Sequence, residues 1–219
     1  IGPKLKWIKS NLEDKIYLIV LLIVSILLSI LIIKNFSTDF LINTILISSA
    51  FYLFFITLRD FFNKGFKNLA QNTAHFGFSL LILSILFNNL FSTETITNLK
   101  VGETFENTKT KIIFENISQK EEKNYKSIIA KFIIQDSKGK IENLSPELRI
   151  YNQPNTVTSE ADIKTTLLSD KFIVINLLPN QELFNVRYQV KPFMLWIWIS
   201  VILISVGGLM SFLKKEYEK

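Results

Sequence analysis

The feature that most constrains this chain is a set of four long runs that contain no Lys, Arg, Asp or Glu. These runs cover residues 16–33, 40–58, 69–91 and 193–213. A helix of the first run, at 1.5 Å per residue, covers about 27 Å, close to the thickness of the hydrocarbon core of a bilayer. A buried helix of a soluble protein is rarely apolar on every side over such a length. We therefore predict an α-helical transmembrane bundle with four spans, the first two forming an antiparallel hairpin.

A charged stretch of ordinary composition separates the third and fourth runs. Residues 92–192 contain 14 Lys and Arg against 13 Asp and Glu. Short segments rich in Ile, Phe and Val recur along it, with turn signals at 136–139 and 179–180. The predicted strands are 109–118, 127–135, 140–144, 148–151, 163–168, 171–178 and 182–190. We predict one external all-β domain, a sandwich or barrel, inserted between spans three and four.

The basic excess outside this domain predicts the topology. The formal net charge is +6, but the nearly neutral β-domain has no basic patch that indicates nucleic acid. The lead 1–15, the loop 59–73 and the tail 214–219 hold ten Lys and Arg, while the connector 34–39 holds one. By the positive-inside rule the lead and the tail are cytoplasmic. The chain begins at Ile1 without an initiator methionine, so we expect a piece of a longer protein.

The sequence offers one strong nitrogen or sulfur ligand for a metal. The chain has no cysteine and one histidine, His75, near the start of the third run. A ligating side chain at membrane depth is a functional-site hypothesis, because its burial is costly unless a cofactor or a neighbouring helix satisfies it. The other interpretation is that His75 lies at the headgroup boundary and only bonds a neighbour. Residues three, four or seven positions away are expected to share its face: Asn68, Gln71, Asn72, Ser79 and Ile82.

Other residues of the runs predict packing or a second ligand. Gly77 would let a helix or a planar ligand approach closely, and Gly207 with Gly208 would form a similar notch in the last run. Trp196 and Trp198 are expected at the outer membrane boundary. Met210 is expected at roughly the depth of His75, which would make a His and Met pair around a haem, although a methionine there more often packs or faces lipid.

The β-domain has no metal-ligand spacing, nucleophile elbow or phosphate-binding glycine loop in its sequence. Glu160 and Asp162 would suit acid and base chemistry. Two residues apart on one strand, however, they are more typical of a solvated edge.

Several short stretches form an ordered set along the chain. They are I-G-P-K-L-K-W at 1–7, A-H-F-G at 74–77, P-E-L-R-I-Y at 146–151, S-E-A-D-I at 159–163, D-K-F-I-V at 170–174, V-R-Y-Q-V-K-P-F-M-L-W-I-W at 186–198 and G-G-L at 207–209. With the predicted topology, this set resembles the carboxy-terminal part of the CcmF family, the haem lyase subunit of system I cytochrome c maturation. Phe172 stands where the family commonly has tyrosine. The family's tryptophan-rich haem-handling segment is not in this chain, so we do not expect the chain alone to be active.

The resemblance implies that His75 is an axial ligand to the iron of a transmembrane haem b, oriented by groups such as Gln71. The opposite ligand would come from the part of the protein that precedes Ile1. No catalytic residue is assigned. The implied location is the bacterial inner membrane, or the mitochondrial inner membrane if organellar, with the β-domain in the periplasm.

The implied partners are the N-terminal part of the same protein, a haem chaperone, apocytochrome c with its thiol-reducing and chaperone subunits, and membrane lipid, but no nucleic acid. The resemblance also points to four polar docking positions: Glu147, Arg149, Tyr151 and Glu160. A structural salt bridge between Arg149 and one of the glutamates is the simpler account of them.

Two other functions stay open at this point. The main alternative is a membrane-anchored β-domain that acts as a scaffold or assembly protein without a cofactor. A transporter subunit is the third, but the spans other than the third carry almost no polar residues to line a pathway.

Overall fold

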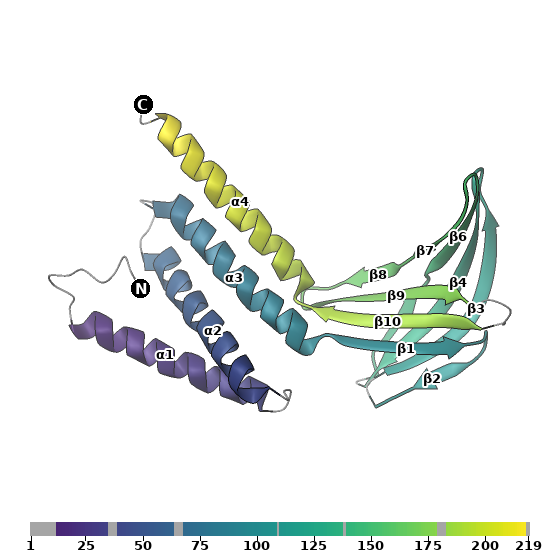
Figure 1. Ribbon diagram of the computed structural model, residues 1–219, viewed down its shortest axis with the longest axis horizontal. Coiled ribbons are helices and arrows are strands. Elements are labelled where there is room, and N and C mark those ends of the chain that lie inside the picture. Colours follow the sequence, from purple (N-terminus) through teal and green to yellow (C-terminus); the bar gives the residue numbers. More distant parts are fainter. Residues whose placement is uncertain are drawn as a thin grey trace. The chain divides into compact units, whose positions relative to one another are not determined.

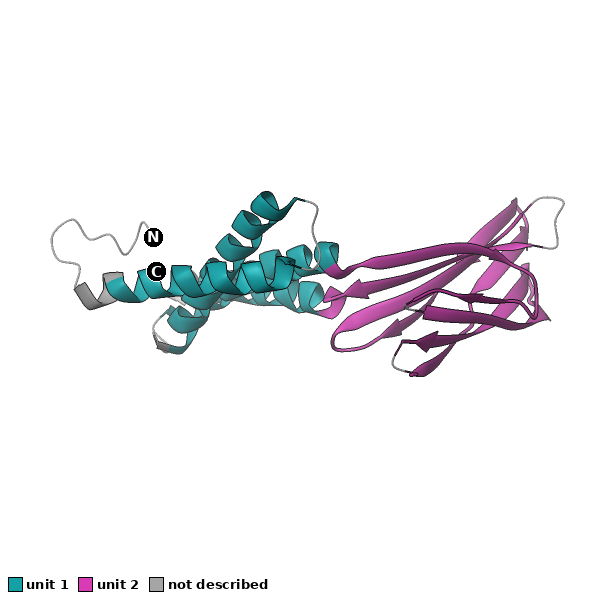
Figure 2. Cartoon of the chain, turned by 90° about the horizontal axis from the view of Figure 1, so that it is seen from below, with its two compact units in different colours: residues 1–90, 196–219 teal, residues 91–195 magenta. Residues whose placement is uncertain are grey.

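The computed structural model describes residues 12–34, 39–63, 68–108, 110–137, 139–178 and 183–217. The chain divides into two compact units, residues 1–90 with 196–219 and residues 91–195 (Figure 2). The helices make up the first unit and the strands the second. The residues of the basic lead up to position 11 and the predicted hairpin at Pro179 and Asn180 lie outside the described residues.

Four helices carry the predicted membrane spans. They are α1 (Leu12–Ile33), α2 (Phe40–Asn63), α3 (Leu69–Phe91) and α4 (Met194–Tyr217) (Figure 1). Each contains a stretch long and apolar enough to cross a membrane, and in α4 this stretch is Met194–Leu213. The guanidinium of Arg59, late in α2, lies 4.1 Å from the ring centre of Tyr17, early in α1, as expected for an antiparallel hairpin. The prediction of four spans is confirmed.

The first three helices share a small apolar cluster. Its buried members are Ile33, Ile47, Ala50, Phe51 and Leu83. Many other apolar side chains of the helices are exposed in this unit, such as Leu31 and Leu41, at 68% and 75%. This distribution suits helices whose outer surfaces meet lipid or further protein in place of water.

The second unit is built from two antiparallel sheets. The first has the order β1 (Thr93–Leu99), β10 (Phe184–Pro192), β9 (Ser169–Leu177) and β8 (Asp162–Thr165). The second has the order β2 (Thr104–Glu106), β3 (Thr110–Glu121), β4 (Tyr125–Asp136), β6 (Glu147–Asn152) and β7 (Asn155–Glu160), and β5 (Ile141–Leu144) also pairs with β4. The inserted domain is therefore a β-sandwich, one of the two forms predicted.

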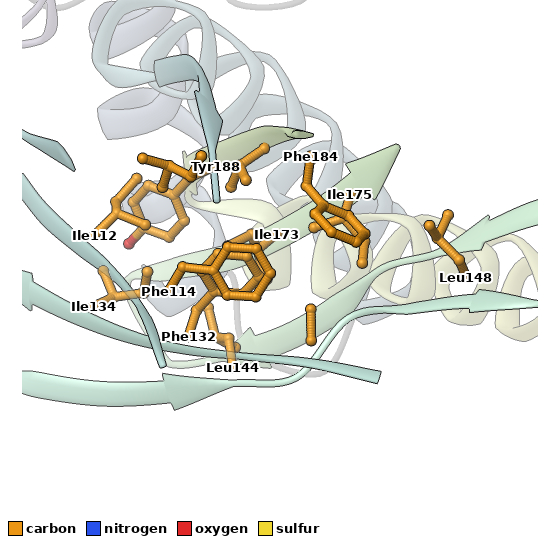
Figure 3. Close-up of a cluster of buried hydrophobic side chains, with 13 residues drawn as sticks. Ile112, Phe114, Phe132, Ile134, Leu144, Leu148, Ile173, Ile175, Phe184 and Tyr188 are labelled. Atoms are coloured by element: carbon orange, nitrogen blue, oxygen red, sulfur yellow. The ribbon is translucent and has the colours of Figure 1, made fainter. Parts of the chain in front are cut away.

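The core of the sandwich lies between the two sheets (Figure 3). Phe114 and Phe132, from neighbouring strands of the second sheet, stack with ring centres 4.4 Å apart. Ile173, Ile175 and Val186 of the first sheet are completely buried opposite them. Buried residues alternate with more exposed ones along much of β4, β9 and β10, which is the period-two pattern of a sheet with one covered face.

The strand predictions were right for most of the domain, but they missed three strands and made a fourth too long. The segments now seen as β1, β2 and β7 were not predicted, because they are rich in Thr, Asn, Ser and Glu and lack a run of Ile or Phe. The turn at 136–139 is confirmed: the amide of Gly139, at φ 78°, donates to the carbonyl of Asp136. The predicted strand 163–168 ends early, since β8 stops at Thr165 and a turn follows.

The prediction that Glu160 and Asp162 lie on one strand edge is wrong. Glu160 ends β7 in the second sheet, whereas Asp162 begins β8 in the first. Asp162 Oδ2 accepts a hydrogen bond from the backbone amide of Ser145, 2.6 Å away. The Asp162 carboxylate thus closes a loop between the sheets.

Candidate functional site

His75 lies in the first third of α3. It is the seventh residue of the helix, about 9 Å along the axis from its start and roughly 8 Å from the midpoint of the span. The side chain is exposed in the helical unit, as are those of Gln71, Phe78 and Ile85. Because residues along an α-helix turn by about 100° each, these four positions form one continuous stripe. We name Gln71, His75, Phe78 and Ile85 the open stripe of α3.

One side of the open stripe is bordered by α2. The hydroxyls of Thr57 on α2 and Ser79 on α3 lie 2.6 Å apart and are both buried. The Asn72 amide donates to the backbone carbonyl of Asp60, 3.2 Å away. The prediction that Asn72 and Ser79 are neighbours of His75 on one face is therefore wrong in part: α2 takes up that side of the helix and uses both polar groups.

The other side is bordered by α4, which approaches α3 backbone to backbone. A Cβ atom on Gly77 would lie 2.9 Å from Leu203 Cβ, and one on Gly207 would lie 2.6 Å from the backbone nitrogen of Ala74. Contacts below 3 Å do not occur for real Cβ atoms, so only glycine fits at these two positions. Gly208 meets nothing within 4 Å, so the predicted notch consists of Gly207 alone.

These contacts also place Met210 relative to His75. Gly77 faces Ser200 to Ile204, and Ala74 faces Gly207, so the two helices are antiparallel and in a fixed register. His75 is then level with a residue near Ile204, and Met210 lies about six residues, or roughly 9 Å, further along α4. The expectation that Met210 shares the depth of His75 is wrong, and the pair is not supported as two ligands of one haem.

The open stripe can present one nitrogen ligand at membrane depth. No hydrogen bond or ion pair to the imidazole of His75 is found among the described residues, and none joins it to Gln71. The described part of the chain also contains no group of three or more His, Cys, Asp or Glu side chains that could hold a bare metal ion. A haem needs only one or two side chains on its iron, because the macrocycle supplies the other ligands. An exposed imidazole beside the ring of Phe78 fits one axial position of such a group.

A second candidate surface lies on the outer face of the sandwich. Glu147, Arg149 and Tyr151 alternate along β6 and point away from the core. The Arg149 Nε donates to Glu147 Oε2 at 3.1 Å, and its guanidinium lies 5.2 Å from the ring centre of Tyr125 on β4. The hydrogen bond from Arg149 holds the pKa of Glu147 below its ordinary value and raises that of Arg149. The salt bridge suggested by the sequence is present, and its partner is Glu147.

Glu160 lies across from Glu147 in the neighbouring strand β7. Its carboxylate accepts a hydrogen bond from Thr158 Oγ1 at 3.1 Å. The four predicted docking positions are therefore brought together on one face, although Arg149 is already paired within it.

Four membrane helices, with a ten-stranded sandwich between the third and the fourth, define a multi-pass membrane protein with one inserted β-domain. Residues 90–192 match the family described as the CcmF C-terminal beta-sandwich. The β-domain matches this family model over its whole length, and the chain as a whole is similar to the C-terminal part of CcmF proteins.

The relatives of this chain include cytochrome c-type biogenesis proteins, which match it over two thirds or all of its length. The cytochrome c-type biogenesis protein CcmF of Escherichia coli (strain K12) is 23% identical over 229 residues, which cover 100% of this chain and 35% of the relative. The cytochrome c-type biogenesis protein ccl1 of Rhodobacter capsulatus is 28% identical over 144 residues, which cover 66% of this chain and 22% of the relative. A solved structure titled Cytochrome c Heme Lyase CcmF shares the fold, with a TM-score of 0.66 and 17% identity over 92% of this chain and 34% of that chain. The chain thus spans between about a fifth and about a third of the length of these proteins.

Proposed function

We propose that this chain is the C-terminal part of a membrane haem lyase of cytochrome c maturation, and that His75 supplies one axial ligand to a transmembrane b-type haem. The observation that carries the proposal is the position of His75 on the open stripe of α3, exposed between the sides taken by α2 and α4. The matched part is 35% of one relative and 22% of the other, so the opposite ligand and the haem-handling segment have a place in the rest of the protein.

The contribution of this chain to such a site is positional. The bond between Thr57 and Ser79 and the contact at Gly77 and Gly207 hold α3 on two sides. These contacts fix the depth of His75 in the span and the direction in which its imidazole points from α3. A haem bound there would supply one-electron redox chemistry, and Gln71, one turn before His75, is placed to orient the ring.

We assign the sandwich to the periplasmic side of the bacterial inner membrane and both chain ends to the cytoplasm. The excess of Lys and Arg in residues 1–15, 59–73 and 214–219 supports this orientation. The outer face that carries Glu147, Arg149, Tyr151 and Glu160 would then dock the haem chaperone or apocytochrome c. Tyr and Arg side chains gathered on an exposed face are typical of protein interfaces.

The test of the ligand is spectroscopic and uses the full-length protein. His75→Ala is expected to remove b-type haem absorption from the purified protein without lowering its amount in the membrane, because the exposed imidazole makes no packing contact that the fold needs. Asn89→Ala is the matched control, since Asn89 is exposed on the same side of α3 near its other end. An unchanged haem spectrum in His75→Ala would overturn the assignment. Absence of haem from the unsubstituted protein as well would favour a scaffold without a cofactor.

A further inference from the structure

The turn between β8 and β9 exposes two consecutive leucines. Leu167 and Leu168 have 69% and 67% of their surface exposed, among the largest values for apolar residues in the sandwich. A soluble surface rarely presents a pair of large apolar side chains at the tip of a tight turn unless the turn meets an apolar partner.

The turn is held in one shape by its first residue. The Thr166 amide donates to the carbonyl of Ser169 at 3.0 Å, and the Ser169 amide donates to Thr166 Oγ1 at 3.1 Å. The Thr166 hydroxyl in turn donates to the Ser169 carbonyl at 2.8 Å. Three hydrogen bonds across four residues keep the two leucines together at the tip.

The turn lies next to the residue at which the last membrane helix begins. The amide of Phe193 donates to the carbonyl of Leu168 at 2.9 Å, and Ser169 lies in register with Pro192. Phe193 immediately precedes Met194, the first residue of the span Met194–Leu213. The apolar tip is therefore at the end of the sheet from which the chain continues into the span.

Residues at the start of α4 and on the strands next to the turn suit the headgroup region. Trp196 and Trp198 stand in the first turn and a half of α4, and indole rings prefer this level of a membrane. Lys164 and Lys191, on the strands beside the turn, supply ammonium groups that can reach phosphate while their stems lie along apolar surface. Asp170 is in register with Lys191 and offsets part of this charge.

We infer that the β8–β9 turn is a membrane anchor: Leu167 and Leu168 insert into the outer interface of the lipid bilayer, at the end of the sheet from which the chain enters its last span. This contact would limit how the sandwich moves at the end of the span. It does not depend on haem ligation by His75.

The test measures contact with lipid in the full-length protein reconstituted into nanodiscs. Residues 1–219 contain no cysteine, so Leu167→Cys and Leu168→Cys each place one fluorescent label in this part of the protein. Doxyl-labelled phosphatidylcholine is expected to quench either label, and iodide in the buffer is expected to have little effect. Signal from label on the unsubstituted protein is subtracted.

Leu177→Cys is the matched control. Leu177 is also an exposed leucine, at 52%, but it lies at the other end of β9, about 26 Å from Ser169. Its label should respond to iodide and not to the doxyl lipid. If iodide quenches the labels at 167 and 168, the turn lies in water and the inference is wrong. Protection from both quenchers would mean that another part of the protein covers the turn, which also overturns it. Haem absorption of the same samples reports separately on His75.

Discussion

In the helical unit, α3 and α4 meet through residues that have almost no side chain, whereas in the sandwich the two sheets are separated by a layer of large ones. Gly77 and Gly207 let the helix backbones touch. Phe114, Phe132 and Phe184 fill the space between the sheets, with ring centres 4.4 to 5.5 Å apart. The two regions therefore reach close packing by opposite choices of residue.

The difference follows from the solvent around each region. In water, the burial of apolar side chains is itself favourable, at about 25 cal/mol per Å² of apolar surface. Large apolar side chains in its core therefore stabilise the sandwich. In lipid, an apolar side chain gains nothing by leaving the hydrocarbon for another helix. Helices there are held by van der Waals contact of close backbones and by bonds such as that between Thr57 and Ser79. A large side chain placed at a helix contact should thus destabilise the helical unit, while polar groups there should contribute most to stability where they are buried.

The largest effect is expected from a large side chain introduced into the contact between α3 and α4. Gly207→Leu would drive its side chain into the backbone of Ala74, and overpacking of this kind costs about 3 kcal/mol or more. We expect a marked loss of folded protein in the membrane and, because α3 is displaced, a loss of bound haem. Protein amount and haem absorption measure the two effects.

The neighbouring glycine provides the control for this prediction. A Cβ atom on Gly208 would meet nothing within 4 Å, so Gly208→Leu should leave protein and haem near their ordinary amounts. Equal damage from the two substitutions would show that the α3 and α4 contact at Gly207 is not important in the full-length protein.

The second prediction concerns a buried charge in the sandwich, whose core otherwise consists of large apolar side chains. Glu142 on β5 is 3% exposed, and its carboxylate lies 2.8 Å from the ammonium groups of both Lys140, just before β5, and Lys171, on β9 of the other sheet. Glu142→Gln leaves Lys171, whose side chain is 14% exposed, without a counter-charge. We expect a loss of about 2 kcal/mol, below the 3–5 kcal/mol of a fully buried pair because Lys140 remains in water. Hydrogen exchange of the β5 and β9 amides should become roughly 30-fold faster.

The same carboxylate makes the sandwich sensitive to acid. Burial raises the pKa of Glu142, but the two lysines outweigh it and leave the pKa below its ordinary value. A group with a lowered folded pKa stabilises above its unfolded pKa, so this contribution should disappear as the pH falls below about 4.3. Glu142→Gln should make the free energy of unfolding less dependent on pH in this range. Glu106→Gln, which removes an exposed pair with Lys111, should change neither quantity measurably.

Much of this architecture could be predicted, because the four spans and the inner strands depend on local patterns of apolar residues. The edge strand β7 could not, since N-T-V-T-S-E becomes a strand only by pairing with β6.

His75 could be chosen because it is the single histidine, but the sequence could not show which of its neighbours are buried and which are exposed. Asn72 and Gln71 are both within one turn of it, and only the position of α2 decides that the first is buried and the second is exposed. Thr57 was missed, although a hydroxyl in the apolar run of α2 was a signal.

The smallest effect is expected from Thr57→Val, which removes the bond to Ser79 but keeps the shape of the side chain. Bonds of this kind between membrane helices contribute about 0.6 kcal/mol on average, because the separated helices find other partners. Thr44→Val is the control, since the Thr44 hydroxyl bonds only to the Phe40 carbonyl of its own helix. Thermal unfolding of Thr57→Val, Ser79→Ala and the double variant gives the coupling between the hydroxyls. A coupling of zero would mean that the glycine contact with α4 alone holds α3, and the rule that buried polar groups matter most in the bundle would fail at this site.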